Sequence, residues 1–387
     1  MLPSPSLPRF LLTVLLSATA LLTARAEPKA IFTDSTAAQL AETKRVAITS
    51  VIISFQTSTG EMKNEKGGLE NVLRGFGRDP KKEALTVLQL QDIDPKMASA
   101  IANEIYAQLQ ADLTASGFEV VPEATLLANP TYQKIVAKTG FANFSRFGNG
   151  SGDTLLVGPD ALKPYLPYAL ELGQFGNLPK NYISGWVSAF GGSSTPGGPS
   201  KMGLGNIWDL PGWEVGLAKE LNAHVVKATY LVTLGTATSH ISNGFTNKDE
   251  LGVLFLSNGN LYLGKNVTTK TTTGTGNAHA QLGLYPSHTR IAFRTPGGKT
   301  KGYTVSRTQL APPAKDGDVV IALAEPLVGG TDFFSVNGQQ KSSGILSKKA
   351  AFEFDFTARI TDAPAYATEV VGMIVTAQRA MLAQVKQ

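Results

Sequence analysis

The pattern of hydrophobic and polar positions along the chain predicts alternating strands and helices. Residues 45–56 read RVAITSVIISFQ, a β-branched run that is apolar on both phases and is therefore typical of a strand covered on both faces. A long helix is predicted over residues 95–116, because Asp94 can cap its first turn and Pro95 suits its first position. Gly117 then ends this helix. Its apolar stripe consists of Met97, Ile101, Ile105, Leu109 and Leu113.

Shorter elements are predicted on either side of an irregular stretch. Residues 118–121 read as a brief strand, and a second helix, begun by Asn129 and Pro130, covers residues 130–139. A short helix near residues 213–222 leads into a β-branched strand over residues 223–238. Residues 57–90 contain Gly and Lys and show little periodicity, so we predict a loop there.

In the C-terminal half, apolar and polar residues alternate in a way that is typical of β-hairpins. The sequence LFLSNGNLYLG places an Asn-Gly turn at residues 258–259, and TRIAFRTPGGKTKGYTVSR places a Gly-Gly turn at residues 297–298. Further strands are predicted over residues 319–323 and 351–360. A closing helix over residues 365–385 follows, begun by an Asp and a Pro.

Together these elements predict the fold class α/β (α+β), a mixed sheet flanked by helices with a β-hairpin-rich part and a long Gly/aromatic insert. The insert interrupts one α/β domain, because helix and strand patterns resume after it. We divide the chain into a signal peptide (1–26), the first part of the α/β domain (27–140), the insert (141–213), the continued α/β domain (214–244), a hairpin-rich region (245–340) and a final strand and closing helix (341–387).

Composition excludes several classes of protein. Of the 387 residues, 42% are hydrophobic and 17% are charged, as in a globular protein rather than a disordered chain. The net charge is +5 without a dense basic block, so we expect no nucleic-acid partner. The chain contains no Cys, which excludes thiol catalysis, metal sites ligated by Cys and acylation at a lipobox cysteine.

The N-terminus has the pattern of a cleaved secretory signal peptide. Arg9 gives the positive n-region, and residues 10–23 form an apolar stretch rich in Leu. The tripeptide Ala-Arg-Ala at residues 24–26 is a small-x-small cleavage site before Glu27. The apolar stretch is too short to span a membrane. We therefore expect a periplasmic or secreted protein.

Motifs for catalysis are weak. The chain has His224, His240, His279 and His288 without metalloprotease spacing, although His279 and His288 could meet across a loop. GNGSGD at residues 148–153 lacks the register of a nucleophile elbow. We therefore expect no catalytic residue, no metal and no cofactor. An exported hydrolase that uses carboxylates or the pair of His279 and His288 stays open as an alternative.

Residues 141–213 contain the best candidates for recognition. This stretch holds all three Trp residues of the chain and many of its Gly and Pro residues, with few charges. A stacking platform or partner surface could be formed by Tyr182, Trp186, Phe190, Trp208 and Trp213. The same side chains could instead form a satellite core under a long loop, and the sequence does not choose between the two.

The order of elements resembles a known group of envelope proteins. The strand KRVAITSVIISF, the helix IANEIYAQLQADLTASG and GFEVV at residues 117–121 follow one another. LNAH at residues 221–224 and AFEFDFTARITDAPAYA follow later. This order resembles the α/β module of the CsgG, LpoB and TolB amino-terminal-domain group of bacterial envelope proteins, which implies action through protein contacts. The long insert and the missing lipidated cysteine depart from the group, and the missing cysteine argues against outer-membrane anchoring and with it against a pore-forming role.

These observations favour a non-catalytic exported envelope protein that binds or helps assemble other envelope or secretion components. Its expected partners are envelope or secretion proteins, through which it could associate with a membrane, and a homo-oligomer stays open. One alternative is a secreted structural or pore-forming subunit, suggested by the Thr-rich run NVTTKTTTGTG at residues 266–276. The other alternative is the exported hydrolase.

Overall fold

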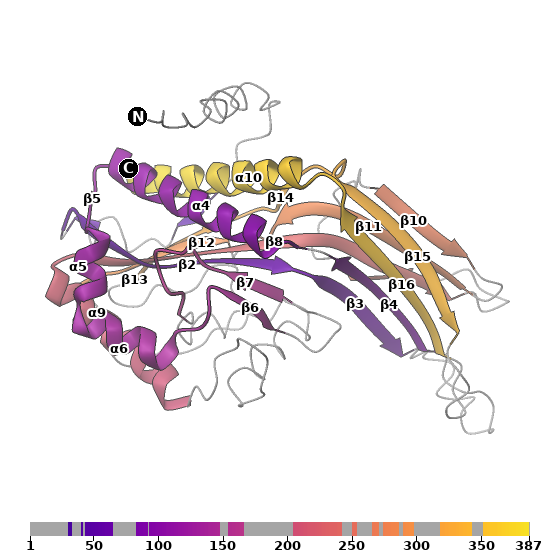
Figure 1. Cartoon of the computed structure of the whole chain (residues 1–387), viewed down its shortest axis with the longest axis horizontal. Helices are drawn as coiled ribbons and strands as arrows, with labels where there is room; N and C mark the ends of the chain where they lie inside the picture. Colours follow the sequence, from indigo (N-terminus) through magenta and orange to yellow (C-terminus); the bar gives the residue numbers. More distant parts are fainter. Residues whose placement is uncertain are drawn as a thin grey trace, which may run out of the picture.

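The chain folds into helices and two β-sheets (Figure 1). The computed structural model describes residues 30–32, 40–41, 43–64, 83–91, 93–147, 154–165, 204–241, 250–253, 265–270, 274–285, 289–297, 318–342 and 351–386. Its helices are α4 (Pro95–Ala115), α5 (Glu123–Ala128), α6 (Pro130–Thr139), α9 (Leu204–Leu221) and α10 (Ala363–Ala383), which the short turn η4 (Gln384–Lys386) follows. The sheets are mixed and flanked by helices, which confirms the predicted α/β fold class.

The strand that was predicted to be covered on both faces lies near the centre of the main sheet. Its path runs through β1 (Ala30–Phe32), β13 (Asp318–Leu323), β12 (Arg290–Arg294), β8 (His224–Ile241), β2 (Arg45–Gln56), β7 (Thr154–Val157) and β6 (Phe144–Phe147). Joined to this path are β5 (Glu119–Val120), β9 (Glu250–Val253), β10 (Lys265–Lys270), β11 (Gly274–Leu284) and β14 (Leu327–Val328). Strands β2 and β8 run parallel, whereas β7 and β12 pair with them antiparallel. Strand β2 is buried along nearly its whole length.

The second sheet corrects one expectation from the sequence. It contains β15 (Phe334–Ser342), β16 (Ala351–Ile360), β4 (Glu83–Gln91) and β3 (Ser58–Asn64) in that order. The predicted loop over residues 57–90 is therefore wrong, because it includes β3 and β4. Strand β3 reads STGEMKN and has no apolar alternation, so its conformation is set by backbone pairing with β4. Leu88 and Leu90 of β4 are buried in the core.

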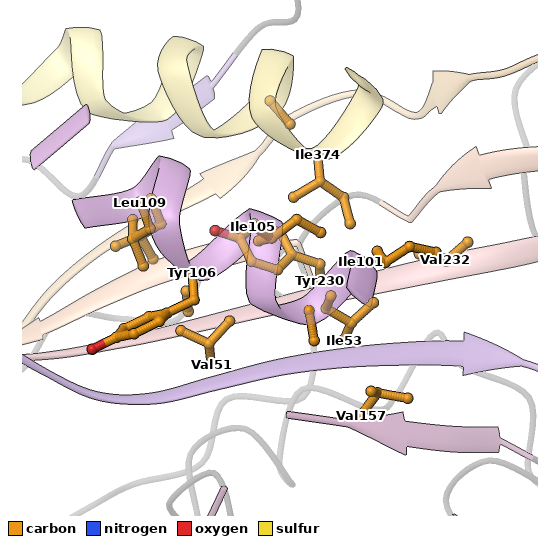
Figure 2. Close-up of a cluster of buried hydrophobic side chains, with 14 of the residues drawn as sticks. Val51, Ile53, Ile101, Ile105, Tyr106, Leu109, Val157, Tyr230, Val232 and Ile374 are labelled. Atoms are coloured by element: carbon orange, nitrogen blue, oxygen red, sulfur yellow. The ribbon is translucent and has the colours of Figure 1, made fainter. Parts of the chain in front are cut away.

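Helices cover both faces of the main sheet (Figure 1). Helices α4 and α10 lie side by side on one face, and Figure 2 shows Ile101 and Ile105 of α4 with Ile374 of α10 above the sheet residue Val51. Side chains of a strand alternate between faces. On β8, Tyr230 contacts α10, whereas Lys227, three positions earlier, contacts α9. Helix α9 therefore lies on the second face, together with α6.

Local signals at the helix ends are confirmed. The side chains of Asp94, Asn129 and Asp362 each accept a hydrogen bond from a backbone N–H in the first turn of α4, α6 and α10. Gly117 follows α4 with a φ of 89°, a left-handed conformation that favours Gly. These boundaries need only a few neighbouring residues, which is why the sequence predicts them.

The remaining predictions have mixed outcomes. The strands predicted over residues 223–238, 319–323 and 351–360 are confirmed as β8, β13 and β16. The helix predicted near residues 213–222 begins earlier, at Leu204, and includes Pro211, a residue that is disfavoured inside a helix. The turn at residues 258–259, the arm after the turn at 297–298 and the signal peptide lie outside the described residues. Part of the Thr-rich run forms the β10–β11 hairpin.

Candidate functional site

Helix α9, where the insert ends, brings a buried charge to the main sheet. Trp213 is half-buried, and the ammonium of Lys134 on α6 lies 4.6 Å from its ring centroid. The next residue, Glu214, is fully buried. One of its carboxylate oxygens lies 2.8 Å from the ammonium of Lys227, and the other lies 3.6 Å from Nε of Arg294. An ion cluster therefore attaches α9 to the sheet.

The cations of this cluster project from neighbouring strands onto one face. Lys227 on β8 is in register with Ala292 on β12, so the two side chains lie on the same face of the sheet. Arg290 and Arg294 lie two positions before and after Ala292 and therefore share this face. All three cations are buried. Burying a charge costs on the order of several kcal/mol unless an opposite charge lies close. Glu214 supplies that charge to Lys227 and Arg294.

Tyr165 borders the same cluster from the segment that follows β7. Its side chain is fully buried, its hydroxyl lies 2.6 Å from Oγ1 of Thr49, and the Lys227 ammonium lies 5.5 Å from its ring centroid. Burial raises the pKa of Tyr165 well above its ordinary value, and the negative charge of Glu214 raises it further. Tyr165 is therefore neutral at physiological pH and serves as a hydrogen-bonding group rather than as a base.

Thr49 marks an irregularity at the centre of the sheet. The register between the parallel strands β2 and β8 shifts between Ile48 and Ser50, so Thr49 is the extra residue of a bulge. The hydroxyl of Thr49 donates to the carbonyl of Val226, and the Tyr132 hydroxyl donates to the carbonyl of Thr49, each at 3.3 Å. Two tyrosines, Tyr132 of α6 and Tyr165, thus hold the bulge in place.

The other candidate groups are dispersed. Nε2 of the buried His224 lies 3.1 Å from the carbonyl oxygen of Thr43, and burial lowers the pKa of His279. The side chains of His240 and His288 lie outside the described part of the chain. Among the described residues, no group of three or more His, Cys, Asp or Glu could hold a metal ion. No helix in the described ranges is long and apolar enough to cross a membrane.

The structure describes only part of the predicted recognition surface. Trp213 lies on α9 and packs against the core as well as against Lys134. Trp208 belongs to the same helix, but its side chain lies outside the described residues. Tyr182, Trp186 and Phe190 also lie outside them. Of the five predicted residues, Trp213 alone therefore has a described side-chain environment, and it lies next to the buried Glu214.

The sequence analysis missed the ion cluster and Tyr165. A signal was present, because Lys227 is a lone charge in the apolar run HVVKATYLV, and Arg290 and Arg294 alternate with apolar residues in RIAFR. An isolated charge at an inward position of a buried strand needs an opposite charge or a hydrogen-bonding partner. The identity of that partner, Glu214, could not be read from the sequence, because it lies on a different element.

Comparison with protein families, with curated proteins and with solved structures found no match for this chain.

Proposed function

We propose that this chain is a non-catalytic exported envelope protein that binds or helps assemble other envelope or secretion components. Its contact surface in this proposal consists of residues 166–203 of the insert together with Trp208 and Trp213 on α9. The partners are envelope or secretion proteins, recognised by aromatic side chains of the kind that dominate protein interfaces.

The observation that carries this proposal is that the residue before the segment and a residue on the helix after it contact the same side chain. Tyr165, just before the segment, has its ring centroid 5.5 Å from the Lys227 ammonium. Glu214, on the helix that follows the segment, has a carboxylate oxygen 2.8 Å from the same ammonium. Tyr165 directly precedes residues 166–203, and Glu214 lies on α9 about 15 Å along the helix from its first residue, so the chain on each side of the segment is attached to the same part of the sheet. Binding residues are frequent on long segments that a rigid scaffold holds on both sides.

Contacts between α9 and α6 support the same proposal. Glu220 accepts hydrogen bonds from Nδ2 of Asn129 at 3.1 Å and from the hydroxyl of Thr131 at 2.7 Å. With the contact between Lys134 and Trp213, these bonds tie α9 to its neighbouring helix. A binding surface attached to a fixed helix loses less conformational entropy when a partner binds. Helix α9 thus has the attachments expected of a scaffold for recognition.

The N-terminal sequence supports the exported location. The signal-peptide pattern ends at residue 26, so the mature protein is expected to begin at Glu27. Cell fractionation followed by N-terminal sequencing of the recovered protein tests this part alone. A cytoplasmic protein that retains residues 1–26 would contradict export while leaving the binding proposal to its own test.

Replacing the insert tests the binding proposal. A linker of about 12 Gly and Ser residues reaches up to about 40 Å, which is ample because the start of α9 lies only about 15 Å of helix from Glu214, beside Tyr165. We expect the variant with residues 168–201 replaced by this linker to keep the wild-type melting temperature. In-cell crosslinking and mass spectrometry should recover a reproducible envelope partner with the wild type and lose it with this variant.

A matched control uses an exposed apolar residue elsewhere. Leu127 on α5 is 39% exposed, and Leu127→Ser changes a hydrophobic surface position outside the insert. Partner recovery should be unchanged by this substitution. Equal recovery by the linker variant and the wild type would overturn the assignment of the insert as the contact surface. Recovery of a lone monomer with the wild type would overturn the assembly role.

A second candidate, a secreted structural or pore-forming subunit, is favoured by the β10–β11 hairpin. Thr268 and Thr269 on β10 are in register with Asn277 and Gly276 on β11, so the Thr-rich run forms a paired arm. Electron microscopy in detergent distinguishes this candidate. Ring-shaped oligomers would support it, and a monomer both in buffer and in detergent would count against it.

A further inference from the structure

We propose that Glu214 and Lys227 are positioning residues, whose buried ion pair holds α9 on the sheet just after Pro211 and thereby fixes the position of the first turns of α9, where the described chain resumes after residue 203. This inference rests on the proposed function only for the statement that the insert binds a partner. The positioning itself follows from the contacts of α9.

The apolar contacts of α9 lie mostly in its last turns. The residues of α9 that join the core cluster are spaced along one side of the helix: Leu210, Leu217, Ala218 and Leu221. The last turn is also held by the two-residue connection from Leu221 to β8 and by the guanidinium of Arg45, which donates to the carbonyl of Leu221 at 2.9 Å. Glu214 interrupts the apolar stripe at its middle. Its carboxylate would stay buried away from Lys227 and Arg294 if this part of the helix moved, so the ion pair opposes such a movement.

Pro211 makes the attachment at Glu214 important for the first part of α9. A proline inside a helix lacks the N–H that would bond the carbonyl four residues earlier, here that of Ile207, and its ring crowds that carbonyl. The first part of α9, which carries Trp208, is therefore connected to the second part by a weakened turn. Glu214 lies less than one turn after Pro211 and next to Trp213, whose ring contacts Lys134, so these two residues hold the helix after the weakened turn.

The weaker contacts of α9 lie farther from this turn. Glu220 is exposed and lies near the end of the helix, and its bonds to Asn129 and Thr131 are on the surface. Exposed polar contacts hold a helix less firmly than a fully buried carboxylate beside an ammonium does. Loss of the pair of Glu214 and Lys227 should therefore free the leading half of α9, while the last turns remain in place.

Spin labels can measure this effect, and the absence of Cys makes the labelling specific. Lys163 and Asp209 are exposed and lie on either side of the segment 166–203. Labels at Lys163→Cys and Asp209→Cys should give one narrow distance distribution in the otherwise unchanged protein. In Glu214→Gln and in Lys227→Met, we expect the distribution to broaden by roughly a factor of two or more, on a folded protein. Lys227→Arg, which keeps the charge, should restore a narrow distribution.

Two comparisons separate positioning from a general loss of stability. A label pair at Lys163→Cys and Lys219→Cys reports on the last turns of α9 and should broaden less. Glu220→Gln removes a charge from the same helix without touching the buried pair, and should leave both distributions narrow. A lower melting temperature with unchanged distance distributions in Glu214→Gln and Lys227→Met would overturn the positioning role and leave a structural one.

A further variant covers the case in which a single substitution prevents folding. The double variant Glu214→Gln/Lys227→Met removes both charges and keeps the side-chain shapes, and it should broaden the distribution between residues 163 and 209. A narrow wild-type distribution in this variant would overturn the inference. If the distribution broadens but crosslinking to the envelope partner is unchanged, the positioning role stands and the proposed contact surface fails.

Discussion

A buried chain of polar groups joins the central strand β8 to both helices of the first layer. The Tyr230 hydroxyl donates to Oε1 of Gln378 at 2.8 Å, and Nε2 of Gln378 donates to Oδ2 of Asp112 at 2.8 Å. Tyr230 and Gln378 are fully buried, so neither can exchange its partner for water. We predict that Tyr230→Phe and Gln378→Leu are strongly non-additive, because each leaves a different polar group without its partner.

The magnitudes follow from the groups that are lost. Tyr230→Phe removes one neutral hydrogen bond and should lower the free energy of unfolding by about 1.5 kcal/mol. Gln378→Leu removes a charge-assisted bond to Asp112 and leaves the buried Tyr230 hydroxyl without an acceptor. This change should lower the free energy of unfolding by about 3 kcal/mol. In the double variant no hydroxyl is stranded, so we expect a loss of about 2.5 kcal/mol and a coupling energy near 2 kcal/mol.

Urea unfolding followed by far-ultraviolet circular dichroism measures the four free energies of this cycle. Arg379→Met is the matched control, because Arg379 also contacts Asp112 but its side chain is 62% exposed. Its loss should change the free energy of unfolding by less than about 1 kcal/mol. Single-variant effects that add within about 0.5 kcal/mol would refute the reasoning, because independent sites behave that way.

Three further predictions concern backbone space and pH. Gly235→Ala should destabilise by more than about 2 kcal/mol in thermal melts, because Gly235 has a φ of 131° and a Cβ there would collide with the carbonyl of His279. Its control, Gly372→Ala in α10, meets open space and should stabilise by about 0.5–1 kcal/mol. Burial lowers the pKa of His279, so as the pH falls this imidazole is protonated in the unfolded chain before it is protonated in the folded protein. Stability should therefore fall as the pH drops below about 6.5. His279→Gln should flatten this pH dependence in thermal melts. Hydrogen bonds from Asn103 and Ser99 lower the pKa of Asp160 in the folded protein. The ionised carboxylate therefore stabilises the fold above its ordinary pKa, and this stabilisation is lost as the pH falls through the lower pKa of the folded state. Asp160→Asn should lack this loss in an acid titration of stability.

Features determined by a few neighbouring residues could be predicted well. The Asp or Asn caps of α4, α6 and α10, the stripe of α4 and the buried run of β2 all depend on local bonds or periodicity. The polar strand β3 was missed because its conformation depends on β4. The early start of α9 was missed because a proline, here Pro211, is disfavoured inside a helix.

The candidate site shows the same division. The sequence indicated the aromatic insert and placed Trp213 at its end, because composition and order are local properties. It could not show that the hydroxyl of Tyr165 lies 2.6 Å from the hydroxyl of Thr49, which is 116 positions earlier in the chain. Nor could it pair Glu214 of a helix with Lys227 of the following strand, since that contact needs the helix to fold back onto the sheet.

By itself, the sequence determined the fold class and the helix ends, because hydrogen-bond caps and hydrophobic periods act over a few residues. Only the tertiary structure decided which charges meet in the interior. Side chains from distant segments converge on one face of the sheet, and a buried charge selects its partner by proximity in space rather than by spacing along the chain.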